Sequence, residues 1–107
     1  MTPKEIIENE IATKLKNKPE RAASVGAVVE LAITGANGGT WTIDCTKPGG
    51  EVKSGSAGAA KLIVTMADTD FVDMCAGKLN PQMAFLGGKI KVKGDISLAL
   101  KLGQLIG

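Results

Sequence analysis

The side chains that most often carry out catalysis are scarce in this sequence. Its 107 residues include no histidine, and its two cysteines are Cys45 and Cys75. Without histidine the chain has no Ser-His or Cys-His nucleophile pair and lacks the commonest metal-binding side chain. Cys45 falls on the apolar face of a predicted strand, and Cys75 follows Met74 on a predicted helix. Because buried thiols keep their protons and react slowly, we expect two reduced structural cysteines and no disulfide.

Other residues that could bind a metal or a phosphate do not have the required spacing. Asp68, Asp70 and Asp73 form a cluster, but it lacks the central glycine and distal glutamate of an EF-hand loop. Acidic residues at the start of a helix are explained by the helix dipole. Residues 87–89 read Gly-Gly-Lys, yet isoleucine follows where a phosphate loop needs Ser or Thr. We therefore predict no metal ion, no cofactor and no catalytic residue.

A short basic segment is the clearest charged feature. Lys89, Lys91 and Lys93 alternate with Ile90 and Val92, so a strand places the three lysines on one face. They have two interpretations: exposed lysines that keep a sheet edge from aggregating, or a patch that contacts anionic membranes. The net charge of +2 arises entirely in residues 54–107, because residues 1–53 hold seven charges of each sign. No aromatic residues interleave with these lysines to stack bases, so we predict no nucleic-acid binding.

The spacing of apolar residues predicts one α+β domain over residues 1–107. An amphipathic helix over residues 2–17 begins with a Thr2–Glu5 capping box and ends before Pro19. Strands are predicted at residues 25–34, 40–46, around Val52, 61–66 and 89–93. Helices are predicted at residues 68–76 and 80–86 and from residue 95 onward. This order favours a five-stranded, largely antiparallel sheet with helices on one face.

The predicted last helix has more apolar surface than a sheet can cover. Its polar stripe is narrow, and apolar residues occupy the rest: Ile96, Leu98, Ala99, Leu100, Leu102, Leu105 and Ile106. A surface helix on a sheet needs only one apolar face. Another helix, a partner subunit or a lipid could cover the second face. With no signal peptide and no apolar run long enough to span a membrane, we expect a cytoplasmic protein.

Several motifs in the second half resemble a known family. Met66-Ala-Asp leads into Asp70-Phe71, and residues 77–85 read Gly-Lys-Leu-Asn-Pro-Gln-Met-Ala-Phe. Residues 88–95 read Gly-Lys-Ile-Lys-Val-Lys-Gly-Asp, and residues 98–102 read Leu-Ala-Leu-Lys-Leu. This pattern resembles the sterol carrier protein 2 family of non-specific lipid-transfer domains. The Trp41-Thr-Ile-Asp strand and the N-terminal helix fit the same family.

The resemblance implies an apolar tunnel between the sheet and the helices. Its ligands would be long-chain fatty acids, fatty acyl-CoA, phospholipids or sterols. Carried over by motif, the residues expected to line it are Trp41, Phe71, Met74, Met83, Phe85, Leu86, Ile96, Leu100 and Leu102. Gln82 of the Asn-Pro-Gln motif is the expected polar group inside it. The final residues, Leu105-Ile-Gly, are not the Ser-Lys-Leu type of peroxisomal address that many relatives carry.

Three kinds of function follow from these expectations. The first is an intracellular lipid carrier. The second is a helper domain that presents a lipid substrate to a separate enzyme. The third is a dimerising module whose last helix packs against its twin. An aliphatic cavity specifies volume and little else, so the preferred lipid does not follow from the sequence.

Overall fold

The fold was obtained as a computed structural model, which describes residues 2–56, 58, 60–99 and 101. The chain begins with one continuous helical segment made of α1 (Pro3–Glu5), a π-helical stretch η1 (Ile6–Ile11) and α2 (Ala12–Asn17). The predicted capping box is confirmed, because the Glu5 backbone N–H donates to Thr2 Oγ1 and the Thr2 N–H donates to Glu5 Oε1. The expected apolar stripe is buried along the whole segment and comprises Ile7, Ile11 and Leu15, together with Ile6.

A helix that the sequence analysis did not predict follows directly. We expected a strand from residue 25, but α3 (Pro19–Val25) occupies this segment, and Val25 is its last residue. Pro19 stands in the first turn, where its missing N–H and fixed φ are tolerated, so it starts a helix as well as ending the previous one. Gly26 closes α3 with a left-handed φ of 62°. The expectation was wrong because the apolar alternation of the next strand extends backwards into Val25.

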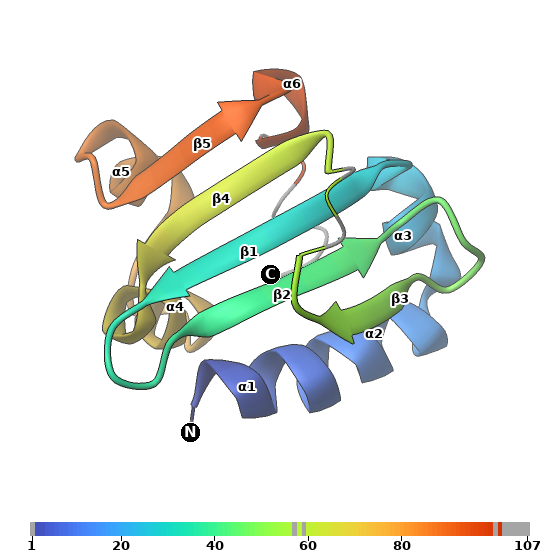
Figure 1. Ribbon diagram of the computed structural model, residues 1–107, viewed down its shortest axis with the longest axis horizontal. Helices are drawn as coiled ribbons and strands as arrows, with labels where there is room; N and C mark the ends of the chain where they lie inside the picture. The colour runs from blue at the N-terminus through green and yellow to red at the C-terminus, as the bar shows by residue number, and fades with distance from the viewer. Residues whose placement is uncertain (1, 57, 59, 100, 102–107) are drawn as a thin grey trace.

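The sheet has the predicted five strands. They are β1 (Val28–Thr34), β2 (Gly39–Asp44), β3 (Glu51–Ser54), β4 (Leu62–Ala67) and β5 (Ile90–Gly94). Their order is β3-β2-β1-β4-β5, and each neighbouring pair is antiparallel except β1 and β4, which are parallel. The prediction of a five-stranded, mostly antiparallel sheet is therefore confirmed. The order makes β3 and β5 the two edge strands (Figure 1).

One face of the sheet forms the core together with the helices. The register places Leu31 of β1 beside Trp41 of β2 and Val64 of β4, and all three side chains are buried. The same core cluster includes Ile7 and Phe71 from the helices. The alternate residues of each strand point to the other face, which is mostly polar or small and partly exposed. In antiparallel sheets one face commonly packs on the core while the other faces water.

Three further helices follow or precede β4 and β5 in the chain. They are α4 (Asp68–Cys75), α5 (Pro81–Leu86) and α6 (Ile96–Ala99). Asp68 is the first residue of α4, and Ala67 holds the cap position without a side-chain hydrogen bond. The Asp68 carboxylate instead accepts from the backbone N–H groups of Asn37, at 3.1 Å, and Thr69, at 2.8 Å. It ties α4 to the β1–β2 turn, where a Cβ on Gly35 would lie 2.5 Å from Asp68 Oδ1.

Candidate functional site

The residues expected to line a tunnel fall into two groups in the structure. Trp41 of β2 and Phe71 and Met74 of α4 are buried members of the main core. The Trp41 indole N–H donates to the Glu8 carboxylate at 3.0 Å, which links the middle of the sheet to the N-terminal helix. These three side chains are packed as ordinary core residues.

The second group lies on the surface. Met83, Phe85 and Leu86 of α5 are 68, 40 and 81% exposed, and Ile96 of α6 is 60% exposed. In the described part of the chain, these are the large apolar side chains that are exposed, and all of them fall between residues 83 and 96. Each helix nevertheless contributes one residue to the core, Ala84 from α5 and Leu98 from α6. Among the side chains that the structure describes in these two helices, the larger apolar ones are thus mostly exposed, apart from Leu98.

Local sequence explains the exposure of α5. Asn80 caps the helix by accepting from the N–H groups of Gln82 and Met83, as its Asn-Pro start predicts. At about 100° per residue, Gln82 and Leu86 point away from the buried Ala84, whereas Met83 and Phe85 flank it. Ala84 is small, so the helix lies close to the sheet with little of its own surface buried.

The remaining predicted lining residues are not brought into a cavity by the described structure. The Gln82 side chain, expected as the polar group inside the tunnel, is exposed. Leu100 and Leu102 lie outside the described residues. The predicted tunnel therefore stays a prediction.

The three lysines of the basic segment are all exposed. Lys91 and Lys93 lie opposite Thr65 and Ile63 of β4 on the partly exposed face of the sheet, while Ile90 points into the core. The Lys89 backbone N–H donates to the Ala84 carbonyl at 2.8 Å, which folds the start of β5 back onto α5. The predicted alternation is thus confirmed within β5, where Lys91 and Lys93 are exposed and Ile90 and Val92 pack on the core, and Lys89 lies just before the strand.

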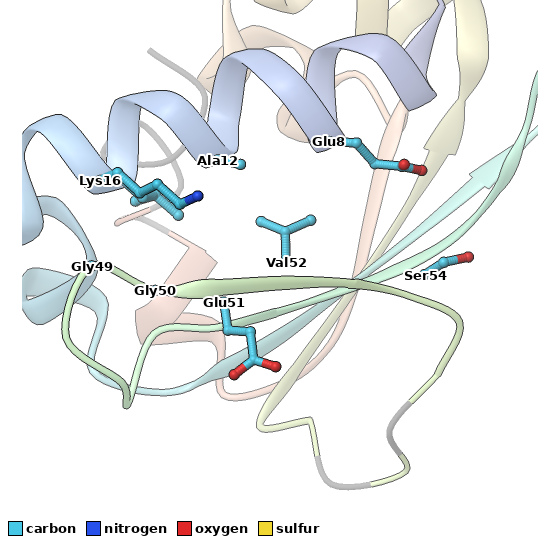
Figure 2. Close-up of a pocket in the computed structure, with 9 residues that line it drawn as sticks. Glu8, Ala12, Lys16, Gly49, Gly50, Glu51, Val52 and Ser54 are labelled. Atoms are coloured by element: carbon cyan, nitrogen blue, oxygen red, sulfur yellow. The ribbon is translucent and has the colours of Figure 1, made fainter.

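A pocket of about 330 Å³ lies elsewhere, between the N-terminal helix and the edge strand β3. Val52 points into it from β3, and Ala12 and Leu15 line it from α2 (Figure 2). Glu8 and Lys16 of the N-terminal helical segment also line this pocket. Sequence analysis did not anticipate this pocket, because it depends on how a helix and a strand far apart in the chain meet. It contains none of the residues predicted to bind lipid.

Neither cysteine is activated as a nucleophile. Burial raises the pKa of both the Cys45 and the Cys75 thiols to about 11, so both keep their protons at neutral pH. A thiol that stays protonated is a poor nucleophile. Within residues 2–56, 58, 60–99 and 101, no three Cys, Asp or Glu side chains come together as metal ligands.

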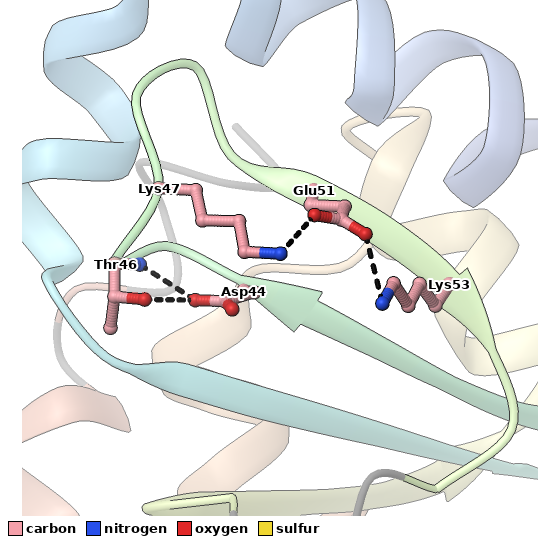
Figure 3. Close-up of polar contacts among 5 residues, drawn as sticks. All are labelled: Asp44, Thr46, Lys47, Glu51 and Lys53. Atoms are coloured by element: carbon pink, nitrogen blue, oxygen red, sulfur yellow. Dashed lines mark hydrogen bonds and ion pairs between the residues drawn. The ribbon is translucent and has the colours of Figure 1, made fainter.

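The charged pairs that do form are ordinary surface contacts. Glu51 bridges Lys47 and Lys53, with 3.0 Å between Glu51 Oε1 and Lys53 Nζ (Figure 3). Hydrogen bonds from the Thr46 hydroxyl and backbone N–H lower the pKa of the Asp44 carboxyl. The two lysines lower the pKa of the Glu51 carboxyl in the same way. These groups are partly or fully exposed, and Glu51 also lines the pocket beside Val52. None of the helices in the described segments combines the length and apolarity needed to cross a bilayer.

The molecule is thus an α+β domain with a mixed five-stranded sheet, a covered core face and two helices with exposed apolar residues. The model of the SCP-2 sterol transfer family matches residues 8–107, and the chain belongs to this family of lipid-binding and lipid-transfer domains. Hydroxysteroid dehydrogenase-like protein 2 of Mus musculus is 46% identical over 81 residues, which cover 75% of this chain and 16% of that protein. Sterol carrier protein 2 of Homo sapiens is 36% identical over 104 residues, which cover 94% of this chain and 19% of that protein.

Solved structures agree with this assignment. The solution structure of palmitated SCP2L2 from Aedes aegypti superposes with a TM-score of 0.79 at 28% identity, covering 99% of this chain and 95% of that one. The chain spans about a fifth or less of the length of the curated relatives named above. The matched segments in those proteins are therefore parts of much longer chains.

Proposed function

We propose that this domain carries a lipid with a long apolar part and catalyses no reaction itself. The candidate ligands are long-chain fatty acids, fatty acyl-CoA, phospholipids and sterols. Met83, Phe85 and Ile96 contact the apolar part of the ligand. The observation that carries this proposal is their exposure on helices that are otherwise docked to the core. Apolar side chains of this size are covered at small energetic cost by a ligand whose own apolar surface also leaves water.

The expected affinity follows from the number of ligand methylene groups that binding would remove from water. Each methylene removed from water contributes about 0.8 kcal/mol, so a dozen contribute on the order of 10 kcal/mol. Immobilising the ligand and the side chains offsets several kcal/mol of this. The remainder is close to the roughly 8 kcal/mol of a micromolar complex. A micromolar affinity suits a carrier, because the lipid must also be released.

One structural neighbour supports a fatty acyl ligand. The SCP2L2 protein from Aedes aegypti was solved in palmitated form. Trp41, Phe71 and Met74 are closely packed here, so a ligand reaches them only if it enters between the helices and the sheet. Trp41 is the chain's one tryptophan, and its fluorescence would report such entry.

The test is a titration of the protein with a fluorescent fatty acid below its micelle threshold. We expect saturable binding with a micromolar or lower Kd, and Met83→Ser combined with Ile96→Ser should weaken it at least about 10-fold. The matched control is Asn9→Ser with Thr13→Ser, two exposed positions on the N-terminal helix. Absence of saturable binding by the unmodified protein would overturn the proposal. Equal weakening in both double variants would remove α5 and α6 from the site.

A helper domain that presents lipid to an enzyme is the second candidate. It is favoured by the relatives named hydroxysteroid dehydrogenase-like protein 2, in which the matched segment is 16% of the Mus musculus chain. In such an arrangement the same apolar site would load the lipid for a catalytic domain. Adding this domain, loaded with lipid, to a lipid-metabolising enzyme should then raise the rate above that with free lipid at the same concentration. No rate increase would favour simple carriage.

A further inference from the structure

The sulfur-containing side chains of the described segments differ in how accessible they are to solvent. These residues are Cys45, Met66, Met74, Cys75 and Met83. Met66 and Met74 are 3 and 6% exposed and belong to the core cluster. Cys45 is buried, and Cys75 is half-buried. Met83 of α5 is 68% exposed, which makes it the most accessible of the five.

The two thiols are also poor targets for an oxidant at neutral pH. Burial raises the pKa of the Cys45 and Cys75 thiols to about 11, so very few of them are thiolates. A peroxide oxidises the thiolate and not the protonated thiol. The thioether of methionine has no proton to lose, so its oxidation depends on whether the oxidant can reach the sulfur. Among the five side chains, Met83 is therefore the one most open to oxidation.

The backbone of Met83 is held in place while its side chain lies in solvent. Its N–H donates to the Oδ1 atom of Asn80 at 3.3 Å, and its carbonyl accepts from the Gly87 N–H at 2.9 Å. The next residue, Ala84, is buried and fixes α5 to the core. An oxidant can thus reach the sulfur of Met83 without any unfolding of the helix.

Met83 also belongs to the group of apolar side chains that the proposed function uses. Phe85 and Ile96 are the other exposed residues expected to contact the apolar part of the ligand. A thioether is apolar and adapts its shape to such a partner. A sulfoxide is polar, and covering it with an alkyl chain that offers no hydrogen bond is unfavourable. One added oxygen atom would therefore change a contact surface for lipid.

We propose that Met83 is a redox-sensitive modification site, where oxidation by a peroxide lowers the affinity of the domain for its lipid. Hydrogen peroxide transfers one oxygen atom to the thioether sulfur, so the O–O bond breaks, an S–O bond forms and water leaves. The sulfur is oxidised and the peroxide is reduced. Methionine sulfoxide reductases reverse this modification. The proposal rests on the proposed function and deepens it by naming a regulation of the same site.

Limited treatment with hydrogen peroxide tests the site itself. Mass spectrometry of proteolytic peptides locates the added oxygen, and we expect Met83 to acquire it at least about 10-fold faster than Met66 and Met74. Saturating palmitate, which has no double bond to oxidise, should slow the reaction at Met83 because the bound chain covers the sulfur. Similar rates at the three methionines, or no protection by palmitate, would overturn the proposal.

The effect on lipid binding is measured with a fluorescent fatty acid before and after the same treatment. We expect the Kd of the unmodified protein to rise about 10-fold and a methionine sulfoxide reductase to restore it. Met83→Leu cannot form a sulfoxide, so peroxide should change the Kd of this variant by less than about twofold. The matched control is Met66→Leu, which replaces a buried methionine at similar volume and should stay as sensitive as the unmodified protein. Met1, which lies outside the described residues, is common to all three proteins.

The outcomes separate this proposal from the proposed function. A loss of affinity that requires Met83 and is reversed by the reductase supports the modification site. Equal losses in Met83→Leu and Met66→Leu would overturn it, because another group would then carry the change. A loss that the reductase does not reverse would also overturn it. If the untreated protein binds fatty acid and peroxide leaves the Kd unchanged, only the modification site fails. If the untreated protein binds no fatty acid, the proposed function fails and the modification site fails with it.

Discussion

The N-terminal helix and the α5–α6 pair both carry large apolar side chains, but the surroundings of these side chains are opposite. Along α1, η1 and α2 the isoleucine side chains are buried against the sheet, and polar residues face solvent. In α5 and α6 the buried residues are Ala84 and Leu98, while larger apolar residues stay exposed. The difference shows that apolar periodicity identifies a helix with a covered side but does not identify what covers it. The N-terminal helix completes the core, whereas α5 and α6 keep large apolar side chains exposed in the described part of the chain.

The largest expected effect is the difference between matched truncations in the two regions. Ile7→Ala removes a fully buried side chain from the N-terminal helix and should lower the free energy of unfolding by about 2–5 kcal/mol. Leu86→Ala removes an exposed side chain from α5 and should change it by less than about 0.5 kcal/mol. Urea unfolding followed by Trp41 fluorescence measures both. Similar losses in the two variants would mean that α5 belongs to the core after all.

The two regions also differ in how well local sequence patterns predict them. The buried stripe of the N-terminal helix, the five strands and the Asn80 cap follow from local patterns, and the structure has them. The exposure of Met83 and Leu86 does not follow, because apolar residues at helical spacing are normally core. The residue type is the same in both regions, and only the three-dimensional placement of α5 distinguishes them.

The other differences have equally physical origins. Helix α3 was missed because Pro19 both ends one helix and starts the next, and Val25 continues the alternation of β1 backwards. The parallel pairing of β1 with β4 joins segments about 30 residues apart, which no local pattern encodes. The pocket beside Val52 arises from the same kind of non-local contact.

A second prediction concerns the hydrogen bond between Trp41 of the sheet and Glu8 of the N-terminal helix. Glu8→Ala removes the acceptor of the Trp41 indole N–H, a bond of 3.0 Å, and should lower the free energy of unfolding by about 1–3 kcal/mol. Glu8→Gln, which keeps an acceptor oxygen, should cost less. The emission of Trp41 should also shift in the alanine variant, since the environment of the indole changes. If Glu8→Ala left both the free energy of unfolding and the Trp41 emission unchanged, this hydrogen bond would not stabilise the fold.

A third prediction compares the helix caps. Thr2→Ala and Asn80→Ala each remove a cap, at a cost of about 1 kcal/mol to the helix concerned. The N-terminal helix is packed over its whole length, so its loss should appear in global unfolding. For α5 the loss should appear mainly as faster amide exchange at Gln82 and Met83, because the helix can open without disrupting the core. If both variants lost the same free energy of global unfolding, α5 would not open separately from the core.

The smallest expected effect tests whether surface charges hold the N-terminal helix in place. Glu51 lines the pocket beside this helix and pairs with Lys47 and Lys53 (Figure 3). Because all three side chains are accessible to solvent, the pairs are screened, and Glu51→Gln should change the free energy of unfolding by less than about 0.5 kcal/mol. Denaturant unfolding at low and at high salt measures this, and the difference between variants should shrink as salt rises. A loss comparable to that of Ile7→Ala would mean that charge, and not the buried isoleucine stripe, fixes this helix to the sheet. The expected result leaves burial as the cause of the difference between the covered helix and the exposed one.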